Sequence, residues 1–221
     1  MALRRIYKEG EAVLKKKSKP VTKFDGRFAL LVDDMIETVK DANGVGLAAP
    51  QVGILKRLIV IDAGGEMGVV ELANPEIIRR VGEQVYYEGC LSYPGYYGNV
   101  GRPESVTIRA HNRKGEVTVY EATGLYAVAC CHEVDHLEGV MFMPKVKWPL
   151  YTLEEVKAMR AKAEAGESPT GESPAGESPA GESPASKSPA DGESPAGGES
   201  GDDGKSAESG KSAEGYMRRI S

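Results

Sequence analysis

The pattern of apolar and polar positions predicts three helices in the chain, over residues 25–41, 124–138 and 152–163. In residues 25–41 the apolar positions recur at spacings of three and four, which is typical of an amphipathic helix. Asp25 stands where a capping residue would lie, and Thr152 and Glu155 have the spacing of a capping box. The starts of the first and third helices are therefore predicted together with their lengths.

Strands are predicted between the first two helices, where short β-branched and apolar runs are bounded by turn residues. We expect a buried strand over 57–62, short strands over 69–72 and 76–87, and a hairpin of 104–110 with 116–121. A glycine-rich loop, residues 43–51, precedes the first of these strands. Strands around one central helix predict an α+β fold with a mixed, mainly antiparallel sheet.

Composition divides the 221 residues near residue 163. Residues 1–163 carry a formal charge of +2 and residues 164–221 carry −7, which together give the net charge of −5. In the second part Gly-Glu-Ser-Pro recurs, and the large apolar side chains are Tyr216, Met217 and Ile220 alone. Such a segment cannot bury enough apolar surface to offset the entropy of ordering it. We expect one folded domain, residues 1–163, and a disordered tail, residues 164–221.

Other features bear on where the protein works. No apolar run approaches the length of a transmembrane helix, and the N-terminus has no apolar core of a signal peptide. The three Cys are an odd number, and two of them, Cys130 and Cys131, are adjacent, which is a poor disulfide framework. We therefore expect a cytoplasmic protein that does not enter a membrane.

The strongest local signal for chemistry is His132-Glu133-Val134-Asp135-His136 in the second predicted helix. Two His at positions i and i+4 lie on one helix face, which suits two ligands of one cation. Glu133, next to the first His, can act as a general base towards water at that cation. Two of the three His in the chain fall in this motif, which favours a metal site over two ordinary surface histidines.

A catalytic metal site of this type needs a third protein ligand and one open position. Glu154 and Glu155 are candidates, but they fall in the short helix that precedes the polar tail. Cys130 and Cys131 precede His132 directly and point away from its face of the helix. Cys90 lies in a separate turn-rich segment and is free to approach. A Glu ligand would indicate an endopeptidase of the HExxH type, and a Cys ligand another class of hydrolase.

Three segments together resemble those of peptide deformylases. They are Gly44-Val45-Gly46-Leu47-Ala48-Ala49-Pro50-Gln51, Glu88-Gly89-Cys90-Leu91-Ser92 and His132-Glu133-Val134-Asp135-His136. Each alone is only moderately specific, but their order and spacing together are typical of the family. The resemblance covers roughly residues 3–147 and leaves out the tail. It implies a hydrolase that removes the formyl group from the N-terminal formylmethionine of nascent chains.

The resemblance also implies roles for individual residues. Cys90, His132 and His136 would be the ligands of one divalent metal ion, which in the family is natively Fe²⁺ and can be replaced by Zn²⁺, Ni²⁺ or Co²⁺. Glu133 would be the general base and then the general acid. Gln51 and the backbone N–H of Leu91 would stabilise the oxyanion. Gly46 would offer backbone hydrogen bonds to the substrate, and the methionine pocket would be lined by Val45, Leu125, Val128 and Ala129.

One departure from the family pattern lies beside the metal ligands. Cys131 stands where many members have Gln just before the first His ligand, which bears on the tuning of the metal rather than on its ligation. The catalytic positions themselves do not depart. Two other classes remain as alternatives: an HExxH-type zinc endopeptidase that uses Glu154 or Glu155 as third ligand, and a degenerate family member that only binds.

The expected partners are N-formylmethionyl nascent peptides, with transient association with the ribosome as a further hypothesis. The tail is anionic along most of its length, and only Arg218-Arg219 near its end are basic. Phosphate groups of RNA repel such a segment, so no direct nucleic-acid site is predicted.

Overall fold

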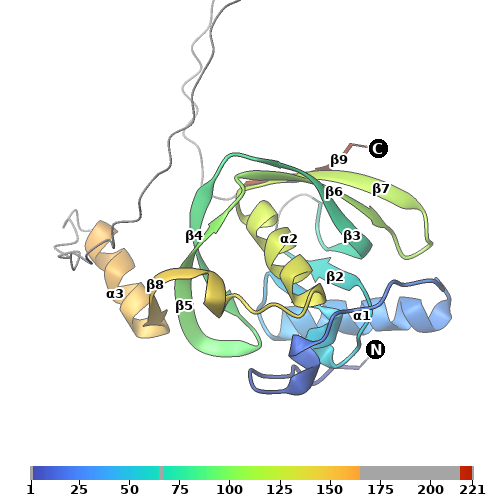
Figure 1. The fold of residues 1–221 in the computed structure, drawn as a ribbon, viewed down its shortest axis with the longest axis horizontal. Coiled ribbons are helices and arrows are strands. Elements are labelled where there is room, and N and C mark those ends of the chain that lie inside the picture. The colour runs from blue at the N-terminus through green and yellow to red at the C-terminus, as the bar shows by residue number, and fades with distance from the viewer. Residues whose placement is uncertain (1, 65–66, 165–214, 221) are drawn as a thin grey trace, which may run out of the picture.

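The computed structural model describes residues 2–64, 67–164 and 215–220 (Figure 1). Within them, one sheet has six strands and a second has three. The helices are α1 (Gly26–Asp41), α2 (Gly124–Leu137) and α3 (Leu153–Glu164), with short 3-10 turns at Ala12–Lys15, Ala49–Val52 and Met143–Lys145. The strands are β1 (Gly46–Ala48), β2 (Leu58–Ile61), β3 (Val70–Val81), β4 (Gln84–Cys90), β5 (Tyr93–Arg102), β6 (Ser105–His111), β7 (Val117–Thr123), β8 (Val146–Thr152) and β9 (Met217–Arg219).

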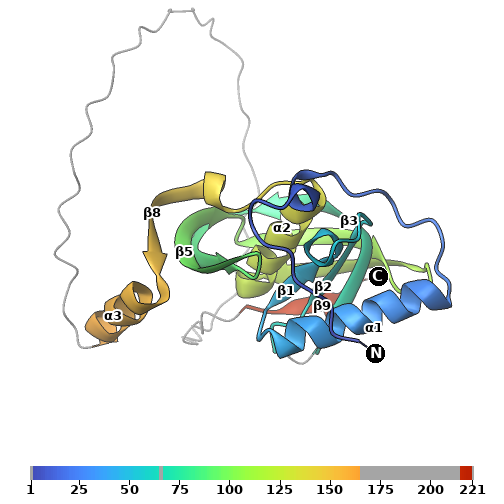
Figure 2. The ribbon, with the colours of Figure 1, turned by 90° about the horizontal axis from the view of Figure 1, so that it is seen from below.

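The larger sheet has the strand order β1-β2-β3-β6-β7-β9, and every neighbouring pair in it is antiparallel. Its strand β2 is buried on both faces, because successive side chains of a strand point to opposite sides. Ile59 and Ile61 belong to the core that includes α2, whereas Leu58 and Val60 belong to the core that includes α1. The sheet is thus covered by α1 on one face and α2 on the other (Figure 2).

The smaller sheet has the order β4-β5-β8 and lies on the other side of α2 from the strands of the larger sheet (Figure 1). Helix α3 follows β8 directly and packs beside this sheet, where the Tyr87 and Tyr151 rings meet at 6.0 Å between centroids. Because α2 lies between the sheets, its side chains can meet residues of β1 from one side and of β4 from the other. That arrangement creates the site described below.

The helices and the hairpin are confirmed by the structure. Asp25 caps α1 by accepting a hydrogen bond from the Phe28 backbone N–H at 3.0 Å. At the start of α3, the Glu155 side chain accepts from the Thr152 backbone N–H at 2.7 Å, and Thr152 Oγ1 accepts from the Glu155 N–H at 3.3 Å. Strands β6 and β7 pair with Ile108 opposite Tyr120, as expected for the predicted hairpin.

The predicted strand over 76–87 is wrong as a single element. Gly82 adopts a positive φ of 66°, so the chain turns there, and β3 ends at Val81 before β4 begins at Gln84. The predicted strand 69–72 is the first part of β3, which continues through an irregularity at Asn74, where φ is 50°. The break is therefore at the Gly82 turn rather than at Asn74-Pro75. Strands β1, β5, β8 and β9 were not predicted.

The expected disordered tail lies largely outside the described residues, which leave out 165–214. At its far end, residues 217–219 form β9 on the edge of the larger sheet, which corrects that part of the prediction. Met217 is 5% exposed and joins the core beneath α2, so one of the few apolar residues of the tail is buried by the body of the protein. In the part of the chain that the structure describes, no helix is both long and apolar enough to cross a membrane.

Candidate metal centre and substrate pocket

The two His of α2 and the Cys at the end of β4 converge on one point. The ligand atoms of Cys90, His132 and His136 all lie within 4.8 Å of one another, and all three residues are buried. Cys90 Sγ is 3.2 Å from His136 Nε2, and the two imidazole centroids are 5.0 Å apart. A thiolate and two imidazoles at such distances match the donor set of a catalytic metal site with one position left open. The structure brings together the ligands that the resemblance implies.

The orientation of His132 is set by a carboxylate on the neighbouring strand. Its Nδ1 lies 2.8 Å from Oε2 of Glu88, which directs the other ring nitrogen towards the cluster. Glu88 is also held by the Arg102 guanidinium through two bonds, at 2.5 Å and 2.9 Å. Burial alone would raise the pKa of Glu88, but Arg102 and His132 outweigh it and hold that pKa below its usual value.

Arg102 links this strand pair to the helix as well. Its Nη1 donates to Asp135 Oδ2 at 2.6 Å, and the same oxygen accepts from Lys145 Nζ at 2.7 Å. Arg102 is 6% exposed, so two carboxylates share one buried guanidinium. Such a group is costly to leave unpaired, and it therefore fixes β4, β5 and α2 relative to one another.

The Glu133 side chain points from α2 towards Gly46, the first residue of β1. It is 4% exposed, and burial raises its pKa to about 7. Its Oε1 lies so near Gly46 that a Cβ there would come within 2.6 Å of it. Its Oε2 is buried without a hydrogen-bond partner within the described protein. A buried carboxyl oxygen of this kind, beside a metal-type ligand set, is suited to bind a water or a substrate group.

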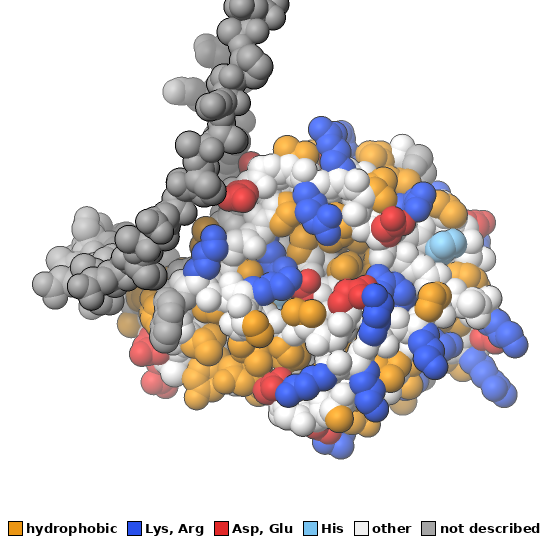
Figure 3. Space-filling view, viewed as in Figure 1, with side chains coloured by type: hydrophobic (Ala, Val, Ile, Leu, Met, Phe, Trp, Pro, Cys, Tyr) orange, Lys and Arg blue, Asp and Glu red, His pale blue; other side chains and the backbone are white. Residues whose placement is uncertain are grey.

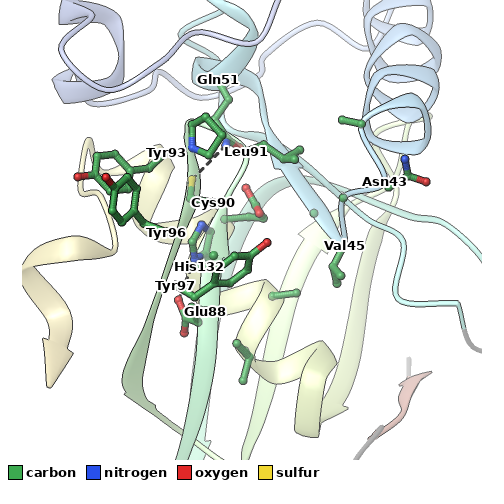
Figure 4. Close-up of a pocket in the computed structure, with 18 of the residues that line it drawn as sticks. Asn43, Val45, Gln51, Glu88, Cys90, Leu91, Tyr93, Tyr96, Tyr97 and His132 are labelled. Carbon is green, nitrogen blue, oxygen red and sulfur yellow. Dashed lines mark hydrogen bonds and ion pairs between the residues drawn. The ribbon is translucent and has the colours of Figure 1, made fainter. Parts of the chain in front are cut away.

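The Gln51 side chain lies next to the thiol of Cys90 (Figure 4). Its Oε1 accepts from the Ala48 backbone N–H at 2.7 Å, so its Nε2 must point the other way. That Nε2 lies 3.7 Å from Cys90 Sγ and donates to Ser92 Oγ at 3.2 Å. Gln51 is 1% exposed, so the donors of its Nε2 are directed at Cys90 and Ser92 rather than at bulk solvent.

The two His differ in protonation. Burial lowers the pKa of His136 well below its usual value, which favours the neutral imidazole with one ring nitrogen free to bind a cation. Burial acts in the same direction on His132, but its hydrogen bonds with Cys90 and Glu88 outweigh that effect and raise its pKa. A cation that binds there must displace a proton, as is general for metal sites of this type.

A pocket of about 560 Å³ opens beside the cluster. Its walls include Cys90, His132 and Glu133, and the two residues expected to stabilise the oxyanion, Gln51 and Leu91. They also include the residues expected to bind substrate, namely Val45, Gly46, Leu125, Val128 and Ala129. Tyrosines of β4 and β5 also line the pocket, namely Tyr86, Tyr87, Tyr93, Tyr96 and Tyr97. Hydrophobic side chains also gather over the region of β5 and β8 (Figure 3), where Tyr96 is 45% exposed. An apolar rim of this kind suits an extended peptide.

The remaining ligand candidates stay away from the cluster. Glu155 accepts the hydrogen bonds that begin α3, and Glu154 is exposed on the same helix. Cys130 and Cys131 point into the core between α2 and the larger sheet. Burial raises the pKa of Cys131 to about 11 and that of Cys130 still further, so both remain thiols. Among the described residues, the group that could hold a metal ion therefore contains Cys90 beside the two His, and neither Glu154 nor Glu155 belongs to it.

Sequence reasoning missed the residues that support the ligands, above all Glu88 and Arg102. One signal was available for Glu88, because it lies two residues before Cys90 on a strand and so shares its face. The spacing of Asp135 three residues after His132 is a similar signal on the helix. Arg102 offered none, because its partners come from a different strand and from α2.

Comparison with known proteins gives a consistent result. The model of the polypeptide deformylase family matches residues 3–149. A peptide deformylase of Alkaliphilus metalliredigens is 54% identical over 146 residues, which cover 66% of this chain and 98% of that protein. Peptide deformylase 1 of Bacillus subtilis is 45% identical over 159 residues, or 72% of this chain and 99% of that one.

Solved structures agree. The crystal structure of a peptide deformylase from Thermotoga maritima aligns with a TM-score of 0.65 at 40% identity, covering 67% of this chain and all of that one. An actinonin-bound peptide deformylase from Acinetobacter baumannii aligns with a TM-score of 0.63 at 34% identity, covering 66% of this chain and 100% of that one. A structure of the same class is bound to Met-Ala-Ser.

Proposed function

The chain belongs to the peptide deformylase family, and we propose that Glu133 and the Cys90–His132–His136 centre carry out its reaction. The protein is a metal-dependent hydrolase that removes the formyl group from the N-terminal formylmethionine of new polypeptides and releases formate. One observation supports these roles most directly. Cys90, His132 and Glu133, whose Oε2 has no hydrogen-bond partner among the described residues, line one pocket that is large enough for a methionyl peptide. The ligand atoms of His136 lie within 4.8 Å of those of Cys90 and His132.

The donor set suits a single divalent ion. One thiolate and two neutral imidazoles leave a bound ion a net charge of about +1, so that it remains a Lewis acid. We propose Fe²⁺ as the resident metal, with Zn²⁺, Ni²⁺ or Co²⁺ as substitutes. When bound, such an ion polarises the formyl oxygen and lowers the pKa of water so that hydroxide is available near neutral pH.

Glu133 moves the proton. Its Oε2 accepts a proton from the attacking water, whose oxygen bonds to the formyl carbon. The same carboxyl then gives that proton to the amine nitrogen as the C–N bond breaks. The products are a free N-terminal amine and formic acid, which loses its remaining acidic proton to leave as formate. A pKa of about 7 suits both tasks, because the group can be deprotonated before attack and protonated before release.

Gln51 and Leu91 stabilise the negative charge that develops on the formyl oxygen. Gln51 Nε2 is already directed at the cluster because its Oε1 is held by the Ala48 N–H. The Leu91 N–H is the second donor, in the residue directly after the Cys90 ligand. Loss of one such preorganised donor typically costs about 2.7–4 kcal/mol of barrier stabilisation.

The substrate lies between β1 and α2. The backbone of Gly46 forms hydrogen bonds with the peptide backbone of the substrate. The methionine side chain enters between Val45 on the loop and three residues of α2, namely Leu125, Val128 and Ala129. Apolar walls with few polar groups suit an unbranched thioether side chain.

Substitution of the base tests these roles. We expect Glu133→Ala to lose formyl-Met-peptide hydrolysis while it retains the bound metal, because Glu133 is not one of the ligands. Glu154→Ala is the matched control, with activity unchanged. Full activity of Glu133→Ala would refute the mechanism. The endopeptidase alternative is not supported, because the group that could hold a metal ion contains Cys90 rather than Glu154 or Glu155, and the family is that of deformylases.

We also propose that the protein works in the cytoplasm and meets its substrates in transient association with ribosomes. Three free, buried cysteines and a thiolate ligand support a reducing compartment. The anionic composition of residues 164–221 argues against direct contact of that segment with RNA. Co-sedimentation of the intact protein with ribosomes, against a chain that ends at Ala163, tests the association and the part of the tail in it.

A further inference from the structure

The C-terminal end of the chain lies against the start of the metal-binding helix. The family match ends at residue 149, whereas β9 spans Met217–Arg219. β9 pairs with β7, and the last residue of β7, Thr123, directly precedes α2 (Figure 1). A segment outside the shared family region therefore contacts the element that carries both His ligands.

The contact at Thr123 is made by backbone and side chain together. The Thr123 N–H donates to the Tyr216 carbonyl at 2.8 Å, and the Tyr216 N–H donates to Thr123 Oγ1 at 3.0 Å. Thr123 is the N-cap residue of α2, but its side chain makes no capping bond to that helix. Its hydroxyl holds the C-terminal segment instead.

Gly215 allows this approach because it has no side chain. A Cβ at this position would come within 2.2 Å of the Thr123 carbonyl oxygen and 2.8 Å of Gly124 Cα. Its φ of 68° lies in the region that favours glycine. The backbone of the segment thus lies directly against the Thr123–Gly124 peptide.

The next two residues fix the register of the strand. Met217 lies opposite Ala122, and both are buried in the core that includes α2. Arg218 lies opposite Glu121 on the other face, and Nη2 donates to Glu121 Oε2 at 2.6 Å. A shift of one residue would expose Met217 and bury Arg218, so a single register is favoured.

We propose that residues 215–220 position the first turns of α2 and, through them, the helix wall of the substrate pocket. Leu125, Val128 and Ala129 follow Thr123 within two turns and line that pocket. The inference rests on the proposed function, which assigns this wall to the methionine side chain. The segment itself is not among the residues that line the pocket, so its residues are positioning residues that affect substrate binding rather than the chemical step.

The test uses the full chain with two variants. Gly215→Ala introduces a backbone clash, and Thr123→Val removes the hydroxyl that accepts from Tyr216 while keeping the side-chain shape. We expect amide hydrogen exchange to rise in residues 215–220 and also in residues 123–129. KM for a formylmethionyl peptide should rise about threefold or more, with kcat and metal content nearly unchanged. Leu30→Ala, at an exposed side chain of α1 outside both the segment and the pocket, is the control and should change none of these.

Three outcomes would overturn the proposal. The first is a rise in exchange in residues 215–220 while exchange in residues 123–129 and KM stay as in the unchanged protein. The second is unchanged exchange of residues 215–220 in both variants, which would show that these contacts do not hold the segment. A fall in kcat at constant KM would place the effect at the chemical step. A wild-type protein inactive on formylmethionyl peptides would refute the proposed function instead, and the exchange measurements would still test the coupling.

Discussion

Gly46 and Glu133 lie so close that the carboxylate occupies the space a side chain at residue 46 would need. A Cβ built on Gly46 would come within 2.6 Å of Glu133 Oε1 and 2.9 Å of its Cγ. The glycine belongs to β1 and the glutamate to α2, so this contact forms only when sheet and helix pack as they do. Gly46 therefore leaves room for the carboxyl of Glu133, the proposed general base, in addition to its proposed hydrogen bonds with the substrate backbone.

Gly46→Ala is expected to displace the Glu133 carboxyl and to lower kcat by about ten- to a hundredfold, the cost typical of a small misplacement of a reacting group. Metal content should stay unchanged, because Glu133 is not a ligand. Steady-state kinetics with metal analysis measure both. Gly26→Ala, at the start of α1 where nothing lies within 4 Å of the added methyl group, is the matched control. A Gly46→Ala protein with normal kcat would show that the carboxyl tolerates the shift.

Arg102→Met is expected to reduce both stability and metal affinity. The change leaves Glu88 and Asp135 without their shared buried partner, and breaking such a pair typically costs about 3–5 kcal/mol. Glu88 would then orient His132 less well, and loss of such support typically lowers metal affinity by about ten- to a hundredfold. Denaturant unfolding and metal titration measure the two effects.

Arg109→Met is the control for that change, because Arg109 pairs with Glu76 where both side chains are more than half exposed. Exposed pairs contribute at most about 1 kcal/mol, so this variant should remain close to the unchanged protein. Equal effects of the two substitutions would contradict a special role for the buried network.

Features encoded in adjacent residues were predictable from the sequence, and features made by distant residues were not. The cap of Asp25 on α1 and the i, i+4 pair of His132 and His136 depend on local spacing alone. Cys90 was identified through the family resemblance, since nothing local distinguishes it from a buried thiol. The Glu88–Arg102–Asp135 network needs β4, β5 and α2 in place, so no pattern in one segment could reveal it.

The missed strands have physical reasons as well. β5 contains Gly95, Gly98 and Gly101, which weaken the signal of a strand. Gly98 is required there because a Cβ would meet the Val146 side chain of β8 at 2.5 Å. β9 has only three residues, and its one buried side chain, Met217, follows a long polar stretch. In both strands the pairing partner, rather than intrinsic propensity, determines the structure.

Asp34 gives a pH dependence of stability. The Ala2 N–H donates to it at 2.8 Å, and the Arg4 guanidinium donates to its other oxygen. The first of these bonds, together with Arg4, lowers the pKa of Asp34 below 3.8 despite partial burial. A lowered pKa stabilises the folded state above the unfolded value of 3.8, and the contribution is lost as the pH falls through the folded pKa.

Asp34→Asn should therefore lower the free energy of unfolding at neutral pH, and the difference should shrink as the pH falls below 3.8. Denaturant unfolding at several pH values measures it. Glu37→Gln, on the same helix, is the control. A difference that stayed constant down to the acid limit would show that the charge of Asp34 is not its source.

The identity of the third metal ligand can be tested by spectroscopy. A cobalt-substituted protein should show a thiolate-to-metal charge-transfer band, because Cys90 Sγ lies in the cluster with both imidazoles. Cys90→Ser should lose that band together with activity, since the replacement provides no thiolate. Cys131→Ala is the matched control from the residue beside His132. Cys131 is buried in the core and stays a thiol, so its removal should leave the band in place. A band that survived in Cys90→Ser but disappeared in Cys131→Ala would identify Cys131 rather than Cys90 as the thiolate ligand and contradict the proposed metal site.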